Sequence, residues 1–247
     1  LFNRVLEEDI QYMKEGLAKG ILTKERLNEA VTRILATKAS LGLHETINHG
    51  SASFEDYKKE QLDLADRSIT LVKDTQNMLP LNLENHKRIL LQLLGSFDSN
   101  ERVLKKVTEE LEKRGFEITV YEPETNFFDL GTVESFSNDF DAVLYIANIQ
   151  NASNQTVARI HWHTLFGLGN NMPWFTKEVP TALISFGNPY HLYDLPMVET
   201  VVNAYCNYDH FIEMTVKKLT GESSFKGISP VNPFCENILL EELKNEN

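Results

Sequence analysis

The stretch ILLQLLGSFDSNERVLKKVTEELEKRGFEITV, residues 89–120, decides the fold. It begins with an apolar run, 89–94, that only Gln92 interrupts, as is typical of a strand covered on both faces. Apolar residues with helical spacing follow over residues 100–114, and alternating apolar residues then predict a second strand at 116–120. Together they form one strand–helix–strand unit of the length that a parallel crossover needs.

Further apolar runs predict strands at residues 142–147, 181–186 and 199–204. We expect helical segments between these runs, and a helix over residues 211–219. Strands that alternate with helices imply a mostly parallel sheet. The sequence therefore predicts an α/β fold, with a doubly wound, mostly parallel sheet and helices on both faces.

Two amphipathic helices are predicted ahead of the sheet. Thr23 is a suitable N-cap for the second helix, and Gly42 is a candidate left-handed C-cap. The apolar positions with helical spacing are Ile10, Met13, Leu17, Leu27, Val31, Ile34, Leu35 and Leu41. The polar residues 44–53 resemble a linker, so we divide the chain into residues 1–50 and an α/β domain over residues 51–247.

The composition excludes several classes of protein. The chain has 36 acidic and 24 basic residues, a net charge of −12, which repels the phosphates of a nucleic acid. No apolar run approaches the roughly 20 residues that a membrane span needs. The two cysteines, Cys206 and Cys235, show no metal or redox spacing, and we expect free thiols. The chain is therefore expected to be globular, with neither nucleic acid nor membrane as a partner.

No motif indicates a cofactor or a metal. The pair Gly167-Leu168-Gly169 lacks the third glycine of a dinucleotide-binding loop, and the chain has no P-loop. His161 and His163 could share one face of a strand, but no neighbouring carboxylate or cysteine completes a metal site. We expect neither a cofactor nor a metal, and packing is the favoured role of the two histidines.

Catalytic groups are not evident from the residues alone. Ser185, His191 and Asp194 are close in sequence, but no G-x-S-x-G motif surrounds the serine, and a strand serine followed by a polar loop is favoured. None of the carboxylates lies in a distinctive setting for glycoside hydrolysis. We therefore assign no catalytic residue.

One loop is a candidate for ligand contact. Gly187-Asn188-Pro189-Tyr190-His191 follows the strand predicted at 181–186 and should lie at the carboxyl edge of the sheet, where open α/β folds present ligand-facing loops. Asn188, Tyr190 and His191 offer amide, phenol and imidazole groups to a sugar or to a neighbouring domain. The alternative is that they only brace the loop internally.

Several segments together resemble glycoside hydrolase family 3, and they cover nearly all of the chain except residues 97–177, which match loosely. The segments resembling the end of that family's catalytic barrel are Gly20-Ile21-Leu22-Thr23, residues 26–35 and Lys38-Ala39-Ser40-Leu41-Gly42-Leu43. Those resembling its α/β sandwich domain are Ser68-Ile69-Thr70-Leu71-Val72-Lys73, Leu79-Pro80-Leu81, Asn188-Pro189-Tyr190-His191-Leu192, Asn203-Ala204-Tyr205 and residues 226–231. The late segments are most similar to the two-domain β-N-acetylhexosaminidase branch.

This resemblance implies that residues 1–50 are the closing helices of a TIM-like barrel. It also implies that the nucleophilic aspartate, and the histidine–aspartate acid/base pair of that branch, lie in the barrel upstream of Leu1. The chain would then be the accessory domain of a retaining enzyme that releases terminal β-linked N-acetylglucosamine, with the barrel and a carbohydrate as its partners.

One alternative is a free-standing binding or scaffold module with flavodoxin-like topology and without catalysis. Another is a chain with no ligand, kept only for packing or oligomerisation. The N-terminal helices discriminate against a free module, because such a module has no use for two apolar stripes that need another partner. For the compartment we favour the cytoplasm, and secretion stays open because any signal peptide would lie upstream.

Overall fold

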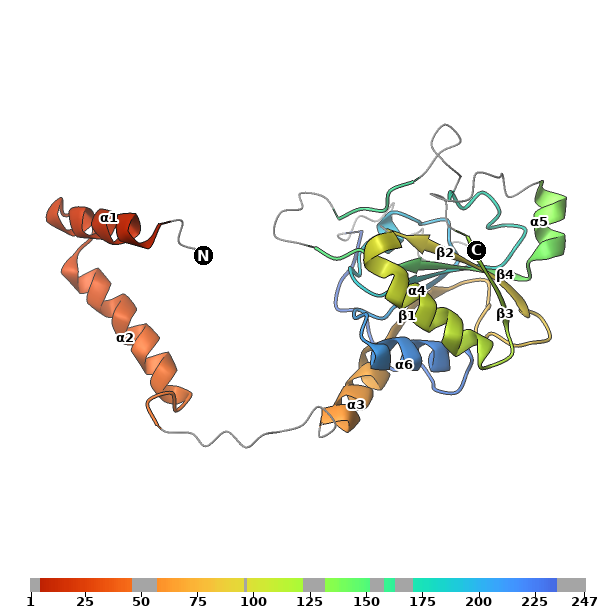
Figure 1. Ribbon diagram of the computed structural model, residues 1–247, viewed down its shortest axis with the longest axis horizontal. Coiled ribbons are helices and arrows are strands. Elements are labelled where there is room, and N and C mark those ends of the chain that lie inside the picture. Colours follow the sequence, from red (N-terminus) through yellow and green to blue (C-terminus); the bar gives the residue numbers. More distant parts are fainter. Residues whose placement is uncertain are drawn as a thin grey trace. The chain divides into compact units, whose positions relative to one another are not determined.

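The computed structural model describes residues 5–45, 57–95, 97–121, 132–151, 158–162 and 171–234. The chain forms two compact units, Leu1–Ser53 and Phe54–Asn247 (Figure 1). None of its described helices is long and apolar enough to cross a bilayer.

The first unit contains helices α1 (Leu6–Ala18) and α2 (Lys24–Ser40). The Thr23 hydroxyl accepts a hydrogen bond from the Arg26 amide at 3.1 Å, which confirms the predicted N-cap. Gly42 has a φ of 67°, as expected for the C-cap. No residue of either helix is buried. Most of the predicted apolar stripe is exposed in this unit, with Ile34 at 56%, whereas Leu17 and Leu27 are partly buried.

The second unit is built on a six-stranded sheet in the order β1-β6-β5-β4-β2-β3. The strands are β1 (Thr70–Asp74), β2 (Arg88–Leu94), β3 (Glu117–Tyr121), β4 (Ala142–Ala147), β5 (Thr181–Ser185) and β6 (Thr200–Asn203). All neighbouring pairs are parallel except β1 and β6, which are antiparallel. The predicted mostly parallel sheet is therefore confirmed, with one antiparallel edge strand.

Helices cover both faces of the sheet, but unequally. One face packs against α3 (Lys58–Ser68), α4 (Phe97–Glu112) and α6 (Asp209–Leu219), which contribute to one apolar cluster with alternate residues of β2. The opposite face carries the short helix α5 (Val133–Asp139) and long loops. The described residues between β4 and β5 are coil and turn, so the helix expected there is not found among them.

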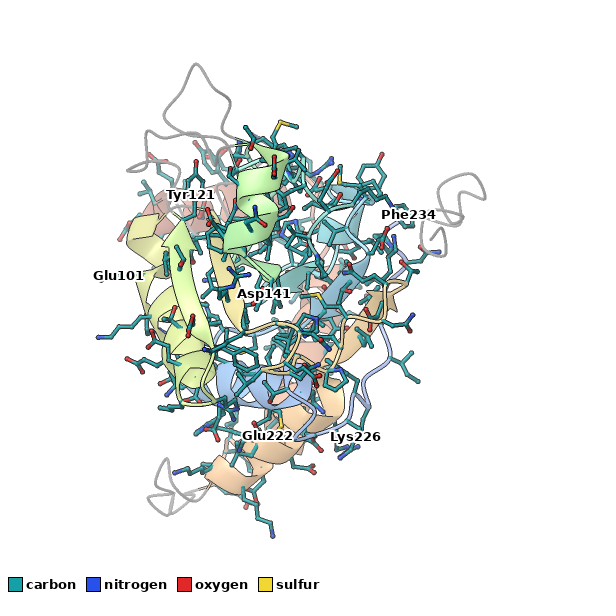
Figure 2. All side chains as sticks on the ribbon, turned by 90° about the vertical axis from the view of Figure 1, so that its right-hand side faces the viewer. Glu101, Tyr121, Asp141, Glu222, Lys226 and Phe234 are labelled. Atoms are coloured by element: carbon teal, nitrogen blue, oxygen red, sulfur yellow. The ribbon has the colours of Figure 1, made fainter. Side chains whose placement is uncertain are left out.

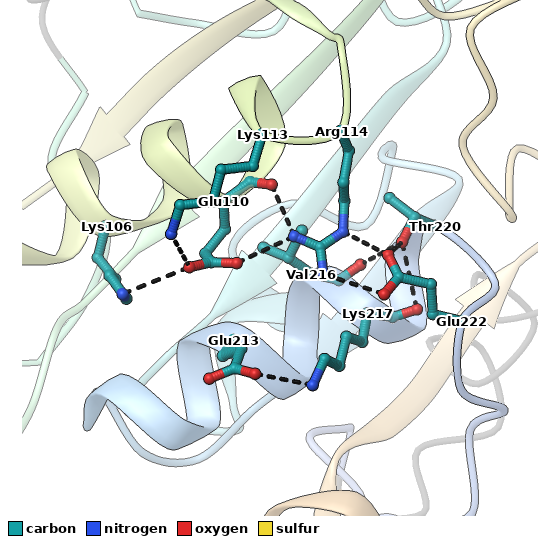
Figure 3. A network of polar contacts seen from close by, with 9 residues as sticks. All are labelled: Lys106, Glu110, Lys113, Arg114, Glu213, Val216, Lys217, Thr220 and Glu222. Carbon is teal, nitrogen blue, oxygen red and sulfur yellow. Dashed lines mark hydrogen bonds and ion pairs between the residues drawn. The ribbon is translucent and has the colours of Figure 1, made fainter.

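A network of ion pairs joins α4 to the end of α6 (Figure 3). Glu110, on α4, is buried and contacts Lys106, Lys113 and Arg114 at 3.3, 2.8 and 2.9 Å. The Arg114 guanidinium also pairs with Glu222, beyond α6, with Nη2 3.1 Å from Oε2. This network holds two of the three helices of the larger layer together.

A second ion pair, formed by a buried lysine, anchors α6 to α3. The Lys218 ammonium, which is fully buried, donates to Asp66 Oδ1 at 2.9 Å. Lys226, labelled beside the lower helices in Figure 2, pairs with the other oxygen of Asp66. Hydrogen bonds from Lys226, Ser223 and Lys218 hold the pKa of Asp66 far below its usual range. The carboxylate of Asp66 thereby neutralises the buried lysine.

The Glu110 network predicts a pH-dependent part of the stability. Burial raises the pKa of Glu110, but hydrogen bonds from Lys113, Arg114 and Lys106 outweigh burial and lower it to about 2. The unfolded state therefore takes up this proton first as the pH falls from 4.5, and the contribution is lost progressively until about pH 2. Urea unfolding between pH 7 and 2 should show this loss.

Substituting Glu110→Gln should lower the free energy of unfolding at pH 7 by about 2 kcal/mol and flatten its pH dependence. The matched control is Glu112→Gln on the same helix, because Glu112 is exposed. Equal stability of the two variants would contradict a stabilising role for the network.

Candidate functional site

The carboxyl ends of β2, β4, β5 and β6 meet at one edge of the sheet, because these strands are parallel. From β2 the chain passes to β3 on one side, and later strands add on the other side, so the strand order reverses between β2 and β4. In open α/β sheets, ligands bind in the crevice outside such a reversal. This edge is therefore the candidate ligand-binding site.

Four amide side chains, which we name the amide cluster, lie at this reversal: Asn100, Asn148, Gln150 and Asn207. Asn148 follows β4 directly and donates through Nδ2 to Asn100 Oδ1. Its Oδ1 accepts from Asn207 Nδ2 at 3.2 Å and from Gln150 Nε2 at 3.4 Å. Asn148 thus ties the end of β4 to α4 and to the connection between β6 and α6.

The predicted loop at residues 187–191 lies next to this cluster. The Asn188 amide donates to the Ile149 carbonyl at 3.2 Å, so the loops after β4 and β5 run side by side. A Cβ on Gly187 would lie 2.7 Å from that carbonyl, so only glycine permits this approach. The loop is therefore held in one position.

Internal hydrogen bonds also brace the loop. The Ser185 hydroxyl donates to the Asn188 carbonyl at 2.7 Å, and the Tyr190 amide donates to Asn188 Oδ1 at 2.9 Å. Asn203, at the end of β6, donates to the Pro189 carbonyl at 3.2 Å. The Asn188 side chain is only partly buried, and Tyr190 is 48% exposed, so both retain surface for a further contact.

His191 differs from the other two residues because it is buried. Its Nδ1 lies 3.1 Å from Asp194 Oδ2, and Asp194 also pairs with Arg159. Its Nε2 is buried and has no hydrogen-bond partner among the residues the structure describes. Ser185 donates to a backbone carbonyl instead of to His191, so the three residues do not form a catalytic triad.

Three of the other sequence candidates lie outside the described residues: His163, Cys235 and the pair Gly167-Leu168-Gly169. Cys206 is described, and its thiol is free. In the part of the chain that the structure describes, no three His, Cys, Asp or Glu side chains come together to hold a metal ion.

Sequence reasoning missed the amide cluster. One local signal was present, because Asn148 follows the apolar run 142–147 without a break. The other members come from distant positions, and only the strand order brings them together.

Comparisons with known proteins show which enzymes the chain is similar to. No family model matches the chain. A β-N-acetylglucosaminidase/β-glucosidase of Cellulomonas fimi is 38% identical over 95% of the chain, which spans 44% of that protein. The solved structure of a β-glucoside phosphorylase, BglX, bound to 2FGlc is 38% identical over 95% of the chain, with a TM-score of 0.75. The chain spans 43% of that protein.

These homologues are members of glycoside hydrolase family 3. The chain is similar to the C-terminal part of such enzymes, and its mostly parallel six-stranded sheet with helices has the fold expected of their α/β sandwich domain. A family 3 β-N-acetylglucosaminidase from Paenibacillus sp. shares the fold, with a TM-score of 0.53 at 18% identity over 89% of this chain and 41% of that one.

The loop geometry predicts different effects for its two ring side chains. His191→Ala removes a buried ring and leaves Asp194 without one partner, and should lower the free energy of unfolding by about 2 kcal/mol. Tyr190→Phe removes a hydroxyl from a half-exposed side chain and should change it by less than about 0.5 kcal/mol. Urea unfolding of both variants tests this, and an equal loss would contradict a structural role for the buried His191 side chain.

Proposed function

We propose that the chain is the accessory part of a larger retaining enzyme that removes terminal β-linked N-acetylglucosamine. The observation that carries this proposal is the match to the Cellulomonas fimi β-N-acetylglucosaminidase/β-glucosidase, which extends over 95% of the chain but only 44% of that protein. The nucleophile is supplied by the remaining, catalytic part of the parent enzyme.

The exposed faces of α1 and α2 support an accessory role. Ile10, Met13, Val31 and Leu35 are between 45% and 58% exposed, although they form the apolar stripes of their helices. Burying such side chains removes apolar surface from water, at roughly 25 cal/mol per Å². In the proposed parent enzyme these stripes pack against the preceding barrel.

The carboxyl edge of the sheet supports a role near the substrate. The amide cluster, Asn188 and Tyr190 offer N–H and O–H donors together with carbonyl oxygens, which match the hydroxyl and acetamido groups of a sugar. In our proposal Asn188 and Tyr190 line the substrate entrance, and His191 holds their loop in place.

A second candidate reaction is phosphorolysis. Structures named as a β-glucoside phosphorylase are 38% and 39% identical to this chain over 95% of its length. A phosphorylase transfers the glycosyl group to phosphate, whereas a hydrolase transfers it to water. The parent enzyme could also prefer glucose to N-acetylglucosamine, as the name of the Cellulomonas fimi protein includes both activities.

The chain alone should not release nitrophenol from 4-nitrophenyl N-acetyl-β-glucosaminide, because a covalent glycosidase loses nearly all of its rate without its nucleophile. The parent enzyme should cleave this substrate, and assays with and without inorganic phosphate separate phosphorolysis from hydrolysis. Turnover by the purified chain, abolished by replacing one of its own carboxylates, would contradict the proposal.

Kinetics of the parent enzyme test the substrate entrance. Tyr190→Phe and Asn188→Ala should raise KM several-fold, while Tyr190→Phe leaves the melting temperature nearly unchanged. The control is Tyr12→Phe on α1, whose side chain is 65% exposed. Unchanged kinetics in both loop variants would restrict the loop to a structural role.

A further inference from the structure

A concave pocket of about 350 Å³ lies beside the end of β6. Its walls come from α3, the segment after β6, the first turn of α6 and residues 227–230. Most of this wall is apolar, with Leu64, Phe211 and Ile228 as its larger side chains. We name it the β6 pocket.

The pocket is rigidly built. Gly227 donates to the Ile69 carbonyl at 3.3 Å, and a Cβ at Gly227 would lie 2.2 Å from the Ser68 carbonyl. Residue 227 therefore accommodates only glycine, and the segment lies directly on the start of β1. The next residue, Ile228, is 90% exposed although the backbone before it is fixed. Leu64, which lines the pocket from α3, is 58% exposed.

The chemistry of the walls defines what the pocket can accept. Its one charged side chain, Arg67, is mostly exposed and contacts Asp63 at 3.4 Å. The Ser68 hydroxyl is buried and has no hydrogen-bond partner among the described residues. An occupant would therefore bury an apolar group, and it needs no charge.

The pocket adjoins the candidate site. Cys206 lines the pocket, and the next residue, Asn207, belongs to the amide cluster. Whatever packs on the candidate site is therefore well placed to reach the pocket. This chain spans 44% of its Cellulomonas fimi relative, so a parent enzyme of that length has more than half of its residues outside this chain.

We infer that the β6 pocket receives an apolar side chain from the catalytic part of the parent enzyme. The inference rests on the proposed function and names a surface through which the two parts are joined. Ile228 and Leu64 become buried on docking, and the contact fixes the catalytic part next to the amide cluster.

Cys206 reports directly on the pocket, because its thiol is free and lines the wall. Alkylation by N-ethylmaleimide, followed by mass spectrometry of the Cys206 peptide, should be about tenfold or more slower in the parent enzyme than in the chain alone. In the parent enzyme, Ile228→Asp should raise the rate towards that of the chain. The control Val133→Asp, on α5 and 46% exposed, should leave it unchanged.

Equal alkylation rates in the chain and the parent enzyme would overturn the inference. Protection that appears in the chain alone as its concentration rises would also overturn it, because a second copy would then fill the pocket. If the parent enzyme is active but its Cys206 is alkylated as fast as in the chain alone, only the pocket assignment is refuted. Protected Cys206 without activity on any β-glycoside refutes the proposed function and retains the docking surface.

Discussion

Strand β4 is buried along its whole length, and the rest of the α/β unit depends on covering it. Its neighbours β2 and β5 are both parallel to it, so the chain must return to the amino edge before each new strand. Every such return starts from the carboxyl edge, and the connecting loops therefore gather there. The same constraint that buries the sheet thus creates one edge rich in loops and polar side chains.

The strands could be predicted because burial on both faces leaves continuous apolar runs, as at 89–94 and 142–147. The direction of β1 could not be predicted from the sequence, because a short apolar run does not indicate which strand it pairs with. Helix α5 was missed because it is only seven residues long, although Thr132 and Ser135 form a capping box at its start.

The candidate site was predictable only in part. Sequence order placed the loop at 187–191 after a strand, and the structure describes it there. The sequence did not indicate that His191 would be buried, because spacing alone does not say which side of a loop faces the core. The neighbouring Leu192 and Leu195 are also buried, and the short helical turn that carries His191 and Leu192 turns the imidazole inward. The amide cluster could not be predicted, because only the strand order brings its members together.

We propose that this chain has two tasks in a larger enzyme. In this proposal its apolar surfaces, on α1, α2 and around the β6 pocket, provide area for joining the catalytic part. Its amide-rich edge provides hydrogen-bonding groups that contact the substrate entrance. The second task requires the carboxyl edge to face the catalytic centre.

The most direct test of that claim is a crystal structure of the parent enzyme with N-acetylglucosamine bound. Our account predicts that the sugar lies on the carboxyl side of the sheet, with the loop at 187–191 and the amide cluster facing its binding site. A structure in which the amino edge, near Arg88 and Asp141, faces the bound sugar would contradict it; Asp141 is labelled in Figure 2.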